Sequence, residues 1–177
     1  DSSATVQVKV DVAAVDDAPT LTAVTALTGA SEDTAYNITY ANFLTAANES
    51  DGDGDHVSFR VESVTSGTLT KGGSAVVPGA TTFDTGDTLV WTPDPNANGS
   101  ALNAFTVRAS DGTYFSSAVV PVKVTVAAAN DAPTLTSISA LSGATEDTPF
   151  TIPYAALLAA SDANDVDGGN ISFRLEA

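Results

Sequence analysis

The stretch Val120-Pro121-Val122-Lys123-Val124-Thr125-Val126 indicates the fold class most clearly, because valine occupies every second position in it. Successive side chains of a β-strand point to opposite faces of a sheet, so this period of two places all four valines on one apolar face. The stretch Val6-Gln7-Val8-Lys9-Val10-Asp11-Val12 repeats the pattern near the beginning of the sequence. Both stretches therefore predict half-buried strands.

Shorter alternating runs occupy the region between these two stretches: Tyr36-Ile38-Tyr40, Val57-Phe59-Val61, Leu89-Trp91 and Phe105-Val107. Glycine-containing turn signals such as Ser66-Gly67 and Asn98-Gly99 separate the runs. Roughly seven short strands at this spacing predict an all-β, Ig-like Greek-key sandwich of two sheets. The segments Tyr40–Ala47 and Tyr154–Ala160 lack the alternation, and we expect one or two helical turns in each, leading into an acidic loop.

An internal repeat with an offset of 114 residues organises the chain. Asp17-Ala18-Pro19-Thr20-Leu21-Thr22 recurs from Asp131 to Thr136, and Ser58-Phe59-Arg60 recurs from Ser172 to Arg174. The offset also relates Val8-Lys9-Val10 to Val122-Lys123-Val124. We therefore expect residues 1–15 to be the final strand of one repeat, 16–129 a complete repeat, and 130–177 the first part of the next.

The charge of the chain excludes several classes of partner. Its 22 acidic residues outnumber its 6 basic residues, which gives a formal net charge of −16. Nucleic acid and anionic membrane surfaces would repel such a chain, and no apolar run is long enough to span a bilayer. The absence of cysteine excludes disulfides and thiolate metal sites. An excess of carboxylates instead suits Ca²⁺, which prefers oxygen ligands.

The acidic residues are densest in Asp51-Gly52-Asp53-Gly54-Asp55. Alternating carboxylates with intervening glycines allow a loop to curl around one cation, although a solvated turn would have the same composition. At the repeat offset Asp165 and Asp167 match the first two aspartates, whereas Gly169 stands in place of Asp55. An EF-hand is disfavoured, since His56 occupies the loop position that requires glycine.

Further acidic residues lie where predicted strands end or where repeats meet. Each alone is typical of a turn, but their joint placement at the ends of elements makes them candidate metal ligands. This group contains Asp16, Asp17, Glu32, Asp111, Asn130, Asp131 and Glu146.

Three motifs resemble the cadherin-like tandem repeats of large secreted bacterial adhesins, of the RTX or tandem-95 type, and the resemblance extends over essentially the whole chain. Asn130-Asp131-Ala132-Pro133 resembles the cadherin linker motif Asn-Asp-Asn-Ala-Pro, shortened by one residue. The stretch Trp91–Gly99 and the stretch Phe105–Gly112 resemble the aromatic-Thr-Pro, Asn-Gly and Ser-Asp-Gly motifs of that class. The resemblance implies Ca²⁺ at the junctions between successive repeats.

Carried over residue by residue, the resemblance implies two groups of ligands. The first junction would use Asp16, Asp17, Asp51, Asp53 and Asp111, with Asp55 in the same loop. The second would use Glu32, Asn130, Asp131, Asp165 and Asp167, and Glu146 is the counterpart of Glu32 in the following repeat. The Leu-Asp-Arg-Glu motif of cadherins is absent, so Asp87 or Asp94 would have to substitute, or fewer ions would bind.

The expected function is that of an extracellular, calcium-rigidified extender in an adhesin that supports cell adhesion and biofilm formation. The expected partners are the neighbouring repeats and, through the adhesin, cell-surface or polysaccharide ligands. An enzyme is not expected, because the single histidine, His56, has no Ser or Cys partner in a recognisable motif. Two alternatives remain open: carbohydrate binding through Tyr114 and Phe115, and a filament or lattice in which strand exchange between copies completes the partial repeats.

Overall fold

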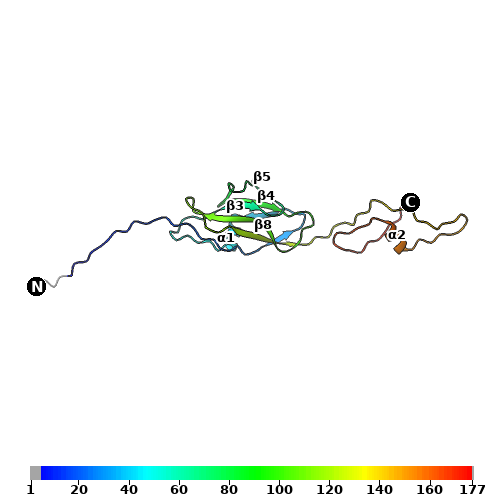
Figure 1. Cartoon of the computed structure of the whole chain (residues 1–177), viewed down its shortest axis with the longest axis horizontal. Coiled ribbons are helices and arrows are strands. Elements are labelled where there is room, and N and C mark those ends of the chain that lie inside the picture. The colour runs from blue at the N-terminus through cyan, green and yellow to red at the C-terminus, as the bar shows by residue number, and fades with distance from the viewer. Residues whose placement is uncertain (1–4, 177) are drawn as a thin grey trace. The chain divides into compact units, whose positions relative to one another are not determined.

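The computed structural model describes residues 5–176, and the chain divides into two compact units. Unit 1 comprises residues 1–127 and unit 2 comprises residues 128–177. Figure 1 shows strands in unit 1 and the second of two short helices in unit 2. Each unit is described by itself below.

Unit 1 is a sandwich of two sheets, as the strand periodicity predicts. The five-stranded sheet has the order β1-β9-β8-β3-β6, formed by Leu27–Ser31, Val120–Ala127, Gly99–Ser110, Ser58–Val64 and Thr82–Phe83. The four-stranded sheet has the order β2-β7-β4-β5, formed by Tyr36–Thr39, Thr88–Thr92, Thr68–Lys71 and Ser74–Ala75. The β1–β9 pair is parallel and the other strand pairs are antiparallel.

The core lies between the two sheets and is built from the apolar face of each alternating strand. The four valines of β9 are buried, while Pro121 and Lys123 on its other face are exposed. Trp91 of β7 is also fully buried, and its indole Nε1 donates a hydrogen bond of 2.9 Å to the Ser66 carbonyl. Both observations agree with the predicted period of two, and they place Trp91 in the core rather than on a ligand-binding surface.

The predicted helical turns are present as α1 (Tyr40–Ala46) and α2 (Tyr154–Ala160). The Thr39 hydroxyl accepts a hydrogen bond from the Asn42 amide and so caps α1. Phe43 of α1 is fully buried, and its ring meets that of Phe59 edge-on at a centroid distance of 4.7 Å. This contact fixes α1 on the sandwich and therefore sets the starting point of the acidic loop that follows.

The final strand expected in residues 1–15 stays a prediction, and residues 1–4 lie outside the described residues. Residues 5–15 form no strand, and the valines of this segment are 77–87% exposed. An isolated strand cannot satisfy its backbone groups with hydrogen bonds to a neighbour, so an alternating sequence is not sufficient for strand formation. The same pattern does form β9, where both neighbouring strands are present.

Unit 2 reproduces the first part of unit 1 at the repeat offset. The isolated bridge between Thr20 and Ser50 has a counterpart between Thr134 and Asn164. The helix α2 occupies the place of α1. No residue between 128 and 176 is buried, so this part of the chain has the local geometry of the repeat without its core.

Candidate metal centre

Asp51 organises the loop that follows α1. Its Oδ1 accepts hydrogen bonds from the amides of Asp53 at 2.9 Å and Asp55 at 3.1 Å. Gly54 has φ of +82°, a conformation that glycine adopts without the steric cost of a side chain. The Asp-Gly alternation therefore forms a curled loop, as predicted. One oxygen of Asp51 accepts hydrogen bonds from two amides of this loop.

Residues 5–17, which lead into the sandwich of unit 1 and are called the incoming segment below, are fastened to this loop. The Asp17 amide donates a hydrogen bond of 2.8 Å to Asp53 Oδ2. A two-stranded bridge between Thr20 and Ser50 continues the contact, with backbone hydrogen bonds of 2.7 and 3.0 Å. Two of the predicted ligands, Asp17 and Asp53, are thus brought together from positions 36 residues apart.

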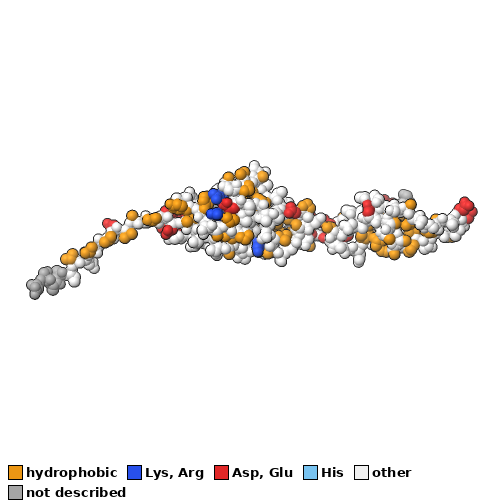
Figure 2. All heavy atoms as spheres, in the orientation of Figure 1, with side chains coloured by type: hydrophobic (Ala, Val, Ile, Leu, Met, Phe, Trp, Pro, Cys, Tyr) orange, Lys and Arg blue, Asp and Glu red, His pale blue; other side chains and the backbone are white. Residues whose placement is uncertain are grey.

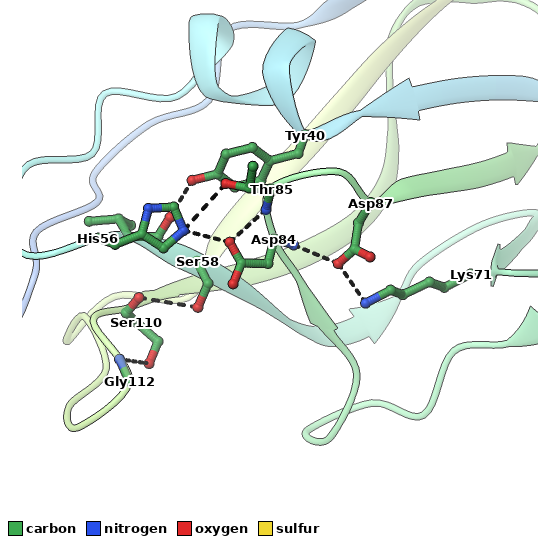
Figure 3. A network of polar contacts seen from close by, with 10 residues as sticks. Tyr40, His56, Ser58, Lys71, Asp84, Thr85, Asp87, Ser110 and Gly112 are labelled. Carbon is green, nitrogen blue, oxygen red and sulfur yellow. Dashed lines mark hydrogen bonds and ion pairs between the residues drawn. The ribbon is translucent and has the colours of Figure 1, made fainter.

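A second acidic loop approaches from the connection between β8 and β9. Asp111 Oδ1 accepts hydrogen bonds from the amides of Thr113 at 2.6 Å and Tyr114 at 2.7 Å. The Gly112 amide donates to the Ser110 hydroxyl at 3.1 Å, which tightens the same turn (Figure 3). This turn holds Asp111 at the end of the five-stranded sheet.

Asp16 lies within electrostatic reach of carboxylates from both acidic loops. Partial desolvation and the carboxylates of Asp111, Asp55 and Asp53 raise the pKa of Asp16, and a hydrogen bond with Thr113 opposes this shift. We use the term acidic cluster for Asp16, Asp17, Asp51, Asp53, Asp55 and Asp111. The structure therefore gathers all the ligands predicted for the first junction at one end of unit 1.

Two oxygens of the acidic cluster lack a hydrogen-bond partner. Asp51 and Asp111 each use Oδ1 to organise their own loop, while Oδ2 of each is buried and accepts no hydrogen bond. A buried carboxylate oxygen without a partner is costly, and Ca²⁺ is a natural partner for such oxygens. Among residues 5–176, no group of three or more acidic or histidine side chains is arranged to hold a metal ion, so Ca²⁺ binding stays a prediction.

A polar network anchors the far end of the loop (Figure 3). The His56 ring lies 2.5 Å from Asp84, and its hydrogen bond lowers the pKa of Asp84. The Tyr40 hydroxyl, at the first turn of α1, donates to the Val57 carbonyl. The loop is therefore fixed at both ends, and His56 serves as a surface contact of the sandwich.

The two proposed substitute ligands are engaged elsewhere. Asp87 forms an ion pair of 2.6 Å with Lys71 and accepts a hydrogen bond from the Asp84 amide. Asp94 Oδ2 accepts a hydrogen bond from the Gly67 amide. Both carboxylates stabilise turns of the sandwich, which gives each a structural role apart from the acidic cluster.

The acidic loop of unit 2 has the same hydrogen bonds as that of unit 1. Asp165 Oδ1 accepts from the amides of Asp167 and Gly169, both at 3.0 Å, and the Asp131 amide donates to Asp167 Oδ2 at 2.6 Å. Asn130 donates from Nδ2 to the Asp131 carbonyl. Since Gly169 replaces Asp55 and retains the amide bond, the loop shape depends on Asp165 and not on the third acidic position.

Comparison with known families identifies the sandwich of unit 1. The family model described as the bacterial Ig domain matches residues 16–125, which is more than half of the chain. The chain belongs to the bacterial Ig domain family. No curated protein and no solved structure matches it.

Bacterial Ig-like domains typically occur in extracellular or surface proteins, and their families are typically non-enzymatic structural modules. In this Ig domain protein, no helix between residues 5 and 176 has the length and apolar character needed to cross a membrane. The family agrees with the predicted Ig-like sandwich and with the general class of surface-protein module.

Glu32 of the Ig domain lies apart from the acidic loop. It follows β1, its amide donates to the Ala127 carbonyl at the end of β9, and its side chain is only 1% exposed. Asn98 donates from Nδ2 to Glu32 Oε2 at 2.7 Å. Its counterpart Glu146 is exposed. Sequence reasoning missed the role of Asn98, although its position in the Asn-Gly motif marked it as a turn residue.

The sequence analysis also missed two side chains that each join two segments of the chain by hydrogen bonds; we call each of them a clamp. Asn48 Oδ1 accepts hydrogen bonds from the amides of Thr22 and Ala23, at 3.0 and 2.8 Å. Asp162, at the repeat offset, accepts the equivalent bonds from Thr136 and Ser137. Asp162 lies only three residues before Asp165 of the acidic loop, but its side chain holds two segments together. The shared offset of Asn48 and Asp162 was the available signal.

The aromatic pair proposed as a carbohydrate platform is partly occupied by the protein itself. Tyr114 and Phe115 are 48% and 38% exposed. The Arg60 guanidinium lies 3.7 Å from the centroid of the Phe115 ring, and Arg60 also forms an ion pair with Glu62. One face of Phe115 is therefore covered, which leaves Tyr114 as the more accessible ring.

Proposed function

We propose that this Ig domain protein is a calcium-rigidified extender of a bacterial surface adhesin, in which Ca²⁺ fixes the incoming chain segment to the sandwich. The observation that carries the proposal is the pair of buried, unpartnered oxygens, Asp51 Oδ2 and Asp111 Oδ2. These oxygens belong to separate loops, and Asp16, in the incoming segment, interacts electrostatically with both loops. One ion shared by these groups would join three separate parts of unit 1.

The charge distribution supports this role. Six carboxylates in the acidic cluster repel one another, and the whole chain carries a formal charge of −16. A divalent cation would remove this repulsion at the place where the incoming segment meets the sandwich. The incoming segment would then resist bending relative to the sandwich, because the ion that binds the acidic loop would also bind Asp16 and Asp17.

The repetition of the loop in unit 2 extends the argument to an array. Asp131, Asp165 and Asp167 stand at the offset positions of Asp17, Asp51 and Asp53, with the same backbone contacts. A cation site at each such position would stiffen successive repeats in the same way. A stiff array of this kind would project a distal binding domain away from the cell surface.

Calcium addition tests the proposal through the stability of the full chain. Binding to the folded state alone adds about 2.7 kcal/mol at a free concentration 100 times Kd. We expect the melting midpoint of unit 1 to rise by on the order of 10 °C between excess chelator and millimolar Ca²⁺. Circular dichroism would measure the midpoint, and Mg²⁺ at equal concentration would control for ionic screening.

Variants of the cluster sharpen the experiment. Asp51→Asn and Asp111→Asn should each abolish most of the calcium-dependent rise, whereas Asp11→Asn, which removes a carboxylate from the exposed segment, should leave it intact. A melting midpoint of the unaltered chain that millimolar Ca²⁺ leaves unchanged would overturn the proposal.

A further inference from the structure

Two arginines lie side by side on the outer face of the five-stranded sheet. Arg60 of β3 is directly opposite Arg108 of β8 in the antiparallel register. Their neighbours along each strand, such as Phe59 and Val107, are fully buried, so both arginines point away from the core. The chain has only six basic residues, and like charges directly opposite each other destabilise a sheet. This pairing by itself therefore lowers the stability of the sandwich.

Arg108 is half-buried and lacks a counter-ion. Its Nη1 donates a hydrogen bond of 3.3 Å to the Ser116 carbonyl, but its Nε is buried and has no hydrogen-bond partner. Between residues 5 and 176, no ion pair includes Arg108. A charged donor that has lost its water and gained no acceptor is costly, whereas an anion bound at this place would satisfy it.

Arg60 is held in one orientation beside Arg108. Its Nε and Nη2 both lie 2.7 Å from Glu62 Oε1, and its guanidinium lies 3.7 Å from the centroid of the Phe115 ring. A bridge with Ser110 holds Phe115 against β8. Figure 2 shows basic side chains beside acidic ones on the visible face of unit 1. An anion that binds here would therefore meet a cation that is already oriented, which lowers the entropic cost of binding.

We propose that Arg60 and Arg108 bind a carboxylate group of an acidic polysaccharide that contains uronate sugars. A guanidinium offers pairs of N–H donors in one plane, which match the two oxygens of a carboxylate. The bound carboxylate would supply the counter-ion that Arg108 lacks and would remove the repulsion between the two opposed cations. The proposal goes beyond the extender role, because it assigns a ligand to the side of the sandwich, and it does not depend on Ca²⁺.

The groups around the two arginines favour a sugar over an acidic peptide. Ser58, Thr82 and Thr106 place hydroxyl groups on the same outer face of the sheet. Hydroxyl groups both donate and accept hydrogen bonds, as those of a sugar do, and Glu62 adds a further acceptor. A peptide carboxylate would leave these groups unused, whereas a neutral sugar would leave Arg108 without a counter-ion.

Isothermal titration calorimetry of the full chain with polygalacturonate oligomers, in excess chelator, tests the proposal. Arg108→Gln should weaken binding by about tenfold or more, the effect of losing a charge-assisted hydrogen bond. The matched variant Lys123→Gln removes the same charge from an exposed position of β9 and should bind like the unaltered chain. No binding by the unaltered chain, or equal losses in the two variants, would overturn the proposal.

Two further probes separate the classes of ligand. Methyl-esterified polygalacturonate keeps the sugar rings but loses the charge, and it should not bind. Polyglutamate keeps the carboxylates without the sugars, and it should bind more weakly than polygalacturonate. Equal affinity for the two acidic polymers would assign the arginines to an acidic peptide and overturn the choice of a polysaccharide.

Phe115 is a positioning residue in this site, since its ring orients Arg60. Phe115→Leu should lower the affinity for polygalacturonate, whereas Phe115→Tyr, which keeps an aromatic ring, should retain it. Circular dichroism melting of both variants would separate a loss of binding from a loss of fold. An affinity that Phe115→Leu leaves unchanged would contradict the orienting role of the ring.

Discussion

Gly67 shows how strongly one residue of the Ig domain depends on its backbone surroundings. It lies in the turn between β3 and β4 with φ of +64°, and its amide donates a hydrogen bond to Asp94 Oδ2. A Cβ atom at this position would lie 2.2 Å from the Thr92 carbonyl oxygen. The turn therefore requires glycine both for its conformation and for the close approach of β7.

A left-handed conformation costs a non-glycine residue about 1–2 kcal/mol. We predict that Gly67→Ala destabilises unit 1 by more than this amount, because the Thr92 carbonyl oxygen must also move away from the added Cβ. Urea unfolding would measure the loss. Gly72→Ala is the matched control, since Gly72 has φ of +58° but no atom within 4 Å of the added carbon. Equal losses in the two variants would show that the contact with Thr92 has no effect on stability.

At the scale of elements, a single side chain joins the two segments of unit 2 that precede and follow α2. Asp162 accepts hydrogen bonds from the amides and hydroxyls of Thr136 and Ser137. These bonds, first that of the Thr136 hydroxyl, lower the pKa of Asp162 well below its usual range. In unit 1 the neutral Asn48 makes the equivalent amide bonds.

This difference predicts a pH dependence for one clamp only. A carboxyl with a lowered folded-state pKa stabilises the fold above its unfolded value of about 3.9 and loses that contribution as pH falls through the folded value. We expect the amide resonances of Thr136 and Ser137 to keep their positions through pH 4 and to move only as pH falls further, toward the lowered folded-state pKa of Asp162, while those of Thr22 and Ala23 stay in place. Two-dimensional NMR from pH 7 down to about pH 1 would measure both. Asp162→Asn should abolish the effect, and resonances that still move in this variant would refute the assignment.

Considered as a whole molecule, the chain combines two units of very different burial. Unit 1 contains the complete core cluster, from Leu21 to Val126. No residue from 128 to 176 is buried, although the local bridges and α2 follow the pattern of unit 1. Since buried apolar area supplies most of the stability of a domain, the two units differ in stability.

We predict that hydrogen exchange separates the two units of the full chain. At low concentration and without Ca²⁺, the amides of β8 and β9 should exchange through global unfolding of unit 1. Those of α2 should exchange orders of magnitude faster through local opening. Mass spectrometry of exchanged peptides would resolve the two classes. Comparable protection of α2 and β8 would contradict the prediction and indicate that unit 2 has a core of its own.

The period of two, the sandwich, the position of both helices and the 114-residue repeat can all be predicted from the amino-acid sequence. These features follow from local sequence, because the alternation of apolar residues and the glycine turns act over a few residues. The resemblance to cadherin-like repeats, and not local sequence, implied that Asp16, Asp17, Asp51, Asp53 and Asp111 form one group of ligands. The structure brings this group together through contacts between loops.

Segments of equivalent sequence nevertheless differ in burial and hydrogen bonding, and these differences could not be predicted from local sequence. Residues 6–13 and β9 share their valines, yet only β9 has neighbouring strands to bond with. Glu32 is buried beside Ala127 and Asn98, while Glu146 is exposed. Burial and hydrogen bonding depend on the partners that the fold brings near a residue, and those partners lie too far along the chain for a local pattern to reveal them.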